Sequence, residues 1–189
     1  INGTGVWEWV THLEKHLNEA AGFDGKDYGL FTRCLFLVWP GNPSSPVNYI
    51  EAARESVRMG PIVADILEQI MIDVPGINLN VMAHSQGNGV MLHALEQLGE
   101  NNLSIDHAIF WQAAIPNDAL SDRNMYQNPM NHDDIYKAQQ TNPWFCPYAH
   151  LGSKQFSIFY SQNDNVLGGL LTQKEQPEGV KIRDVWHAK

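Results

Sequence analysis

The sequence predicts an α/β protein built on a mostly parallel sheet, with helices on both faces of that sheet. Short, continuous apolar runs, which are typical of buried parallel strands, alternate along the chain with longer stretches of helical periodicity. A helix between successive strands returns the chain to the same end of the sheet, so the strands run parallel. The length of 189 residues suits one domain, residues 1–189, and 43% hydrophobic and 17% charged residues are typical of a globular protein.

The strand predictions rest on four apolar runs and a fifth run with a weaker alternation. The four apolar runs are Leu35–Trp39, Leu79–Ala83, Ile105–Trp111 and Phe156–Tyr160, and the weaker run is Val180–Trp186. Pro40 and Gly41 end the first run, and turn residues precede the second. We therefore expect Leu35–Trp39 to be a buried strand of the parallel sheet.

The helix predictions fall between these runs, over Val6–Ala21, Tyr49–Ile72 and Gln86–Leu98. Gly60-Pro61 predicts a kink or a break in the second helix. A stretch rich in Pro, Asn and Asp runs from about Pro116 to Gly152. It is too long for an ordinary connection, so we interpret it as a lid or a binding loop.

The charge of the chain indicates which partners it can take. Twelve Lys and Arg stand against 21 Asp and Glu, for a formal charge of −9, and the basic residues are scattered singly. Nucleic-acid binding needs clustered cations, so we expect no nucleic-acid partner. No apolar run approaches the roughly 20 residues that cross a bilayer, so we expect no integral membrane segment. A small or neutral molecule fits the composition better.

No metal site or cofactor is predicted. Cys34 and Cys146 lack metal-type spacing, and they are compatible with a disulfide or with two buried thiols. His12 and His16 share one helical face at a spacing that can hold zinc. Because no third ligand accompanies them, we interpret them as part of a solvated helix face.

The strongest motif is Ala83-His84-Ser85-Gln86-Gly87, which joins an apolar strand to a helix. A serine at such a turn is the nucleophile-elbow arrangement, in which small residues two before and two after the serine avoid steric crowding. We expect Ser85 to have a strained backbone and to point its hydroxyl outward. The Gln86 N–H and the helix dipole would stabilise an oxyanion. The simpler alternative is that Ser85 only caps the helix.

At this motif the sequence resembles the α/β-hydrolase superfamily, in particular bacterial esterase/lipase-like domains with an Ala-His-Ser-x-Gly-Asn elbow. The stretches that carry the resemblance are Ile1-Asn2-Gly3, Phe36-Leu37-Val38-Trp39-Pro40, Asn80 to Asn88, and Gln112-Ala113-Ala114-Ile115-Pro116. The resemblance implies the α/β-hydrolase fold and a further strand, ending in His-Gly, upstream of Ile1. The chain would then lack its N-terminal strand and form part of a larger protein. The second oxyanion donor would be the N–H of Ile1 or Asn2.

A serine nucleophile needs a histidine to take its proton and a carboxylate to orient that histidine. In this fold they follow the serine in the order acid, then histidine. Asp164 follows the fourth predicted strand and is the expected acid, with Asp118 after the third strand as its rival. His187 follows the last predicted strand and is the expected base. The alternatives are His132, His150 and a histidine beyond Lys189.

These residues predict a serine hydrolase that cleaves a carboxylic ester through an acyl-enzyme, with a small-molecule or lipid ester as substrate. Trp144, Phe145 and Tyr148 of the long stretch would line an apolar acyl site over Ser85. The alternative is a non-catalytic, hydrolase-like binding or interaction module, since a fold alone does not guarantee a function. Convergence of Ser85, a histidine and a carboxylate would distinguish the two.

Overall fold

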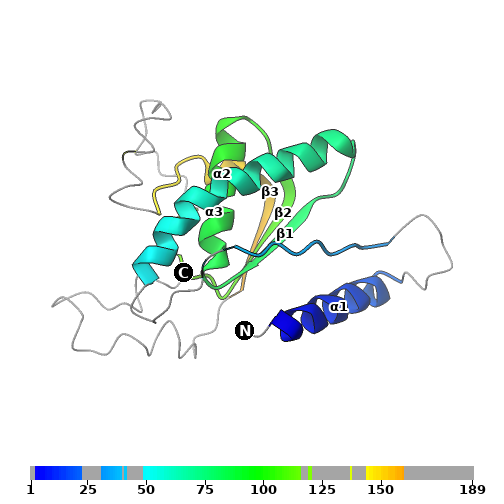
Figure 1. Ribbon diagram of the computed structural model, residues 1–189. Coiled ribbons are helices and arrows are strands. Elements are labelled where there is room, and N and C mark those ends of the chain that lie inside the picture. The colour runs from blue at the N-terminus through cyan, green and yellow to red at the C-terminus, as the bar shows by residue number, and fades with distance from the viewer. Residues whose placement is uncertain are drawn as a thin grey trace. The chain divides into compact units, whose positions relative to one another are not determined.

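Figure 1 shows the computed structural model of the chain. It describes residues 3–22, 31–39, 41, 49–115, 119–120, 137 and 144–159. The chain divides into two compact units, Ile1–Trp39 and Pro40–Lys189, which are described separately below.

The first unit consists of helix α1, Gly3–Ala20, and the extended segment 31–39. The helix confirms the one predicted over Val6–Ala21 and begins three residues earlier. Gly22, at φ 75°, follows its last turn in the left-handed conformation that glycine adopts without strain.

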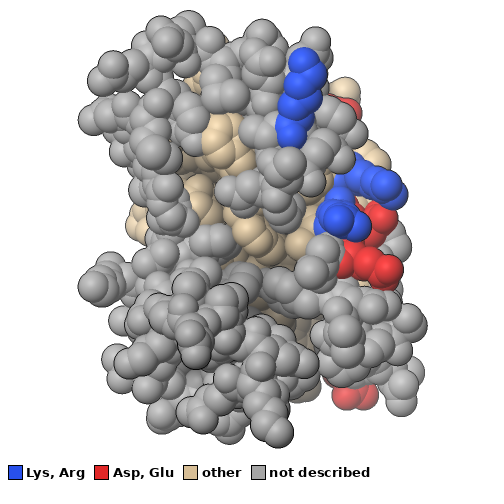
Figure 2. All heavy atoms as spheres, turned by 90° about the vertical axis from the view of Figure 1, so that its left-hand side faces the viewer, with Lys and Arg blue, Asp and Glu red and all other residues tan. Residues whose placement is uncertain are grey.

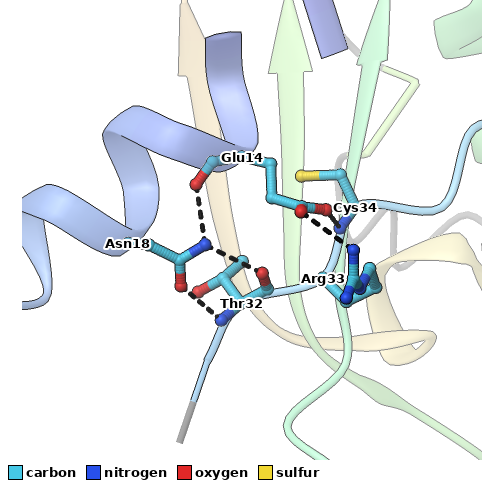
Figure 3. A network of polar contacts seen from close by, with 5 residues as sticks. All are labelled: Glu14, Asn18, Thr32, Arg33 and Cys34. Carbon is cyan, nitrogen blue, oxygen red and sulfur yellow. Dashed lines mark hydrogen bonds and ion pairs between the residues drawn. The ribbon is translucent and has the colours of Figure 1, made fainter. Parts of the chain in front are cut away.

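A network of polar contacts fastens segment 31–39 to α1 (Figure 3). The Asn18 side-chain oxygen accepts the Thr32 N–H at 2.7 Å, and the Asn18 side-chain nitrogen donates to the Thr32 carbonyl at 3.0 Å. The same nitrogen also donates to the Glu14 carbonyl. The Glu14 carboxylate accepts the Cys34 N–H at 2.8 Å and one nitrogen of Arg33 at 3.1 Å. Side chains of a helix thus bind backbone groups of residues 32 and 34.

The prediction of a buried strand at Leu35–Trp39 is wrong. Segment 31–39 has an extended path but is in no strand, and Leu35 and Val38 are 80% and 77% exposed. A strand requires a ladder of backbone partners, whereas the N–H groups of Thr32 and Cys34 are bound by α1 side chains. An apolar run alone does not supply that ladder.

The second unit holds a parallel sheet in the order β1-β2-β3. Its strands are β1 (Asn80–His84), β2 (Ile105–Trp111) and β3 (Ser153–Phe159). They confirm three predicted strands, although β3 begins three residues before the predicted Phe156. His84, Trp111 and Phe159 are neighbours in the register, so the three carboxyl ends lie at one edge. The predicted strand Val180–Trp186 lies outside the described residues.

Two helices of this unit pack on each other, α2 (Tyr49–Asp73) and α3 (Gly87–Glu100). Of the expected kink or break at Gly60-Pro61, the break does not occur, because α2 continues through Pro61 (Figure 1). Gly60 instead permits close packing, since a Cβ there would lie 2.2 Å from the Cβ of His93 on α3. None of the described helices is long and apolar enough to cross a membrane.

The core of the second unit lies between the helices and one face of the sheet. The described apolar side chains with 0% exposure come from α2, α3, β2, the turn after β2 and η2, and they are Ala64, Leu92, Ala94, Leu95, Leu98, Ala108, Phe110, Ala114 and Ala149. Segment 144–152, which includes the short 3-10 helix η2 (Ala149–Leu151), packs along α3. Helix α3 is therefore covered on several sides, and its first residues are held at the carboxyl edge of the sheet.

Candidate active site

Ser85 occupies the turn between β1 and α3 with φ at 52°. A positive φ is uncommon for a residue with a side chain and marks local strain, so the expected strained elbow is confirmed. The Ser85 N–H donates to the Trp111 carbonyl at 3.1 Å, which extends the β1–β2 pairing by one residue. The strain is held in place because the serine is tied to the end of the central strand.

The Ser85 carbonyl accepts three hydrogen bonds. The Asn88 backbone N–H donates at 3.2 Å, the Asn88 side-chain amide at 2.7 Å and the Ala114 N–H at 3.3 Å. Two of these donors belong to the first turn of α3, and the third follows β2. The peptide after Ser85 is consequently fixed from both sides of the turn.

Gln86 stands at the N-cap of α3 with φ −66° and ψ −21°. Its carbonyl accepts the Gly89 N–H, but no acceptor among the described residues binds its own N–H. No acidic residue lies in the first turn of α3, so no carboxylate of α3 competes for the positive end of the helix. The Gln86 N–H is available to a developing oxyanion.

Gln112, directly after β2, is a second residue with a left-handed backbone at the same edge, with φ at 45°. Its N–H donates to the Phe159 carbonyl at 2.7 Å, and its side-chain oxygen lies 2.9 Å from Nε2 of His84. The His84 ring also packs edge-on against Trp111 at 5.2 Å. Sequence reasoning did not select Gln112 for the site, although its position directly after a strand was a signal.

Gly89 of α3 lies close to α2 and to Trp144. A Cβ at Gly89 would lie 2.9 Å from Ser56 Oγ of α2 and 3.1 Å from the Trp144 ring. The small residue therefore makes room for α2 and for Trp144, one turn beyond the elbow.

The three aromatic residues proposed for the acyl site are spread along α3. Trp144 lies beside Gly89, near the elbow, and is half-buried. The Tyr148 backbone instead contacts Glu96 and Gly99, near the other end of α3. With a helical rise of 1.5 Å per residue, Glu96 lies about 16 Å along the axis from Ser85. Half-buried Phe145 directly follows Trp144. The structure brings Trp144, and not Tyr148, to the elbow.

Most residues proposed as acid, base or second oxyanion donor lie outside the described residues: Ile1, Asn2, Asp118, His132, Asp164 and His187. His150 is described, and it lies in η2. The next residue of η2, Leu151, packs against Gly99 near the end of α3. His93 is buried with Nδ1 3.3 Å from the Cys146 sulfur, and His107 bonds Ser157. None of these three histidines lies at the elbow.

The polar groups of the described residues contain no metal centre. No group of three or more His, Cys, Asp and Glu residues could hold a metal ion within the described ranges. Both cysteines are free thiols. Burial and the nearby Glu14 carboxylate raise the pKa of the Cys34 thiol, while Arg33 lowers it.

Four of the described basic side chains pair with carboxylates, and they are Lys15, Arg33, Arg58 and Lys154. Lys154 bonds Asp106 at 2.7 Å, and this bond holds the pKa of Asp106 below its usual range. Arg58 pairs with Glu55 at 2.9 Å. On the face shown in Figure 2, the basic side chains of the described part lie close to acidic ones and form no continuous basic patch.

Comparisons with known proteins fit this geometry. A family model described as an alpha/beta hydrolase of unknown function matches residues 23–172, which is more than half of the chain. An uncharacterized protein of Nostoc sp. (strain PCC 7120), alr1448, is 26% identical over 161 residues. The match covers 72% of this chain and 39% of the length of that relative. No solved structure matches the chain.

Proposed function

Because the chain belongs to this family of alpha/beta hydrolases, we propose that it is a serine hydrolase that cleaves carboxylic esters through an acyl-enzyme on Ser85. The observation that carries the proposal is the elbow. Ser85 has a φ of 52° at the carboxyl end of β1, directly before the helix that presents the Gln86 N–H. A serine that only capped a helix would not need this strained conformation.

In the proposed reaction, the Ser85 hydroxyl attacks the ester carbonyl carbon while a histidine takes its proton. The Gln86 N–H stabilises the oxyanion of the tetrahedral intermediate. Collapse of the intermediate expels the alcohol, which receives the proton from the histidine and leaves an acyl-Ser85 ester. Water, activated by the same histidine, then releases the carboxylic acid.

The acid and the base follow from chain order, and the second oxyanion donor follows from the resemblance to esterase/lipase-like domains. We assign the base to His187, the orienting acid to Asp164 and the second oxyanion donor to the N–H of Ile1 or Asn2. Asp118 is the alternative acid. The geometry around α3 supports Trp144 as the aromatic wall of the acyl site, because its ring lies against Gly89, one turn from Ser85. Phe145 accompanies it, while the position of Tyr148 argues against a role at the elbow.

The proposal is tested with the purified protein, p-nitrophenyl esters of two to eight acyl carbons, and a fluorophosphonate that labels activated serines. We expect ester hydrolysis and stoichiometric labelling, with the label on Ser85 by peptide mass spectrometry. Ser85→Ala should lose the label and nearly all activity. The matched control is Ser104→Ala, since Ser104 directly precedes β2, at the opposite edge of the sheet.

Trp144→Ala refines the same experiment. If the ring forms the acyl site, KM should rise more for the eight-carbon ester than for acetate, because a longer chain covers more of the lost apolar surface. A folded protein that neither hydrolyses these esters nor takes the label would contradict the proposal and favour the non-catalytic binding module.

A further inference from the structure

Asn88 is the only polar side chain of the described residues that joins the elbow to the central strand by two hydrogen bonds. Asn88 is fully buried, at 0% exposure, in the first turn of α3. Its amide nitrogen donates to the Ser85 carbonyl at 2.7 Å and to the Trp111 carbonyl at 3.1 Å. The Asn88 side chain therefore bridges the turn after β1 and the end of β2.

The orientation of this amide is dictated by chemistry. Two carbonyl oxygens face one end of the side chain, and only the NH₂ group can donate to both. The other end, Oδ1, is buried with no hydrogen-bond partner among the described residues. A buried polar atom without a partner is costly, so the two bonds of the nitrogen are favoured enough to outweigh that cost.

The two hydrogen bonds from the Asn88 amide, called the clamp below, act on the proposed oxyanion donor through one peptide group. The carbonyl of Ser85 and the N–H of Gln86 belong to the same planar unit, which is not cis, and they point in opposite directions. Holding the carbonyl inward therefore aims the Gln86 N–H outward from the helix end. Hydrogen bonds to the carbonyl also polarise the peptide and strengthen its N–H as a donor.

We propose that Asn88 is a positioning residue of the active site, which fixes and polarises the Ser85–Gln86 peptide so that the Gln86 N–H faces the oxyanion. This inference rests on the proposed hydrolase function, and it adds a residue that no triad assignment includes. Asn88 does not touch the substrate. Its effect should appear in kcat, because an oxyanion contact is made fully only in the transition state.

The test uses Asn88→Asp and Asn88→Ala with p-nitrophenyl acetate from pH 5.5 to 8.5. Removing an oxyanion donor outright costs about 100- to 1000-fold, and misaiming one should cost less, roughly 10- to 100-fold in kcat with little change in KM. In Asn88→Asp a carboxylate would face two carbonyl oxygens, so burial and repulsion raise its pKa. Once protonated, the carboxyl can donate one of the two bonds.

The ratio of kcat for Asn88→Asp to kcat for the natural protein should therefore rise as the pH falls. The ratio cancels the titration of the catalytic base, which both proteins share. For Asn88→Ala the ratio should stay low and flat. The matched control is Asn80→Asp, because among the described residues the exposed Asn80 side chain on β1 bonds only Asn78. This variant should keep activity within about twofold at every pH.

A measurement without substrate separates this inference from the hydrolase proposal. We expect the NMR amide resonance of Gln86 to shift in Asn88→Ala and to stay in place in Asn80→Asp. An unmoved resonance, or full kcat in a folded Asn88→Ala protein, would overturn the positioning role. An inactive natural protein would instead remove the hydrolase proposal, while the resonance still tests the clamp.

Folding of the variants is checked by near-ultraviolet circular dichroism. If both variants fail to fold, Asn88→Ser is the fallback, because its hydroxyl can replace one donor and should give an intermediate kcat. Loss of the fold in all three variants would overturn the proposal, since Asn88 would then act on folding and not on the oxyanion donor.

Discussion

An oxygen of the Glu96 carboxyl group accepts the backbone N–H of Tyr148 at 2.7 Å, which joins helix α3 to segment 144–152 inside the protein. Glu96 is 3% exposed, and its other oxygen has no hydrogen-bond partner among the described residues. Burial is the main cause that raises the pKa of Glu96 to about 8; the N–H groups of Tyr148 and Ala149 oppose this rise, and the Glu100 carboxylate adds to it. The side chain is thus protonated at neutral pH.

Glu96 should make the stability of the protein depend on pH. Because its pKa is raised on folding, the folded state holds a proton that the unfolded state releases above about pH 4.5. The free energy of unfolding should fall as the pH rises from about 4.5 to about 8. Glu96→Gln removes this titration, so the difference in free energy of unfolding between the two proteins should change by up to about 5 kcal/mol over that window.

The measurement is urea unfolding of both proteins at several pH values between 4.5 and 9. Glu68→Gln, a change of a half-buried carboxyl on α2, serves as the control and should follow the natural protein. Parallel pH curves for Glu96→Gln and the natural protein would show that Glu96 keeps its ordinary pKa in the folded state.

Replacing Gly152 or Gly76 with Ala should destabilise the protein for different reasons, steric overlap at Gly152 and backbone strain at Gly76. The Gly152 φ of −73° is ordinary for any residue, but a Cβ would lie 2.2 Å from the Leu95 carbonyl oxygen on α3. Gly76 is the reverse case, with φ at 80° and no atom within 4 Å. Gly152→Ala should cost about 3 kcal/mol of stability by overpacking, and Gly76→Ala about 1 kcal/mol by left-handed strain. Thermal unfolding checks the order, and equal losses would contradict the packing assigned to segment 144–152.

His187 is the sharpest test of the catalytic assignment. His187→Ala should lower kcat/KM by at least about 1000-fold while the fold is kept, as expected when the base of a triad is lost. His150→Ala is the matched control, because η2 packs against the far end of α3 from Ser85. Full activity of His187→Ala with loss in His132→Ala would move the base into the long stretch after β2.

The acid is decided by a second pair of variants. Asp164→Asn and Asp118→Asn are compared for kcat/KM toward p-nitrophenyl acetate. The acid orients the histidine and stabilises its charged form, so its loss should cost about 10⁴-fold, as in related triads. We expect this loss for Asp164→Asn and near-normal activity for Asp118→Asn. The opposite result would place the acid after β2.

Sequence patterns alone determined the local structure around Ser85. A continuous apolar run, a small–His–Ser–x–Gly turn and a helical stripe predicted β1, the strained serine and α3, because each of these depends on residues near one another in the chain. The same holds for β2, whose predicted and observed bounds agree. Chain order also supplied Asp164 and His187 as candidates, and these remain predictions.

Only the tertiary structure decided which groups those elements meet. Gly60-Pro61 predicted a kink or a break, but α2 continues through it and Gly60 serves the contact with His93. The apolar run at Leu35–Trp39 is in no strand, and α1 side chains bind the backbone of Thr32 and Cys34 just before it. Asn88 and Glu96 look like ordinary helix residues until the carbonyl of Trp111 and the N–H of Tyr148 are placed beside them. Such partners lie 23 and 52 residues away in the chain, so no local pattern can encode them.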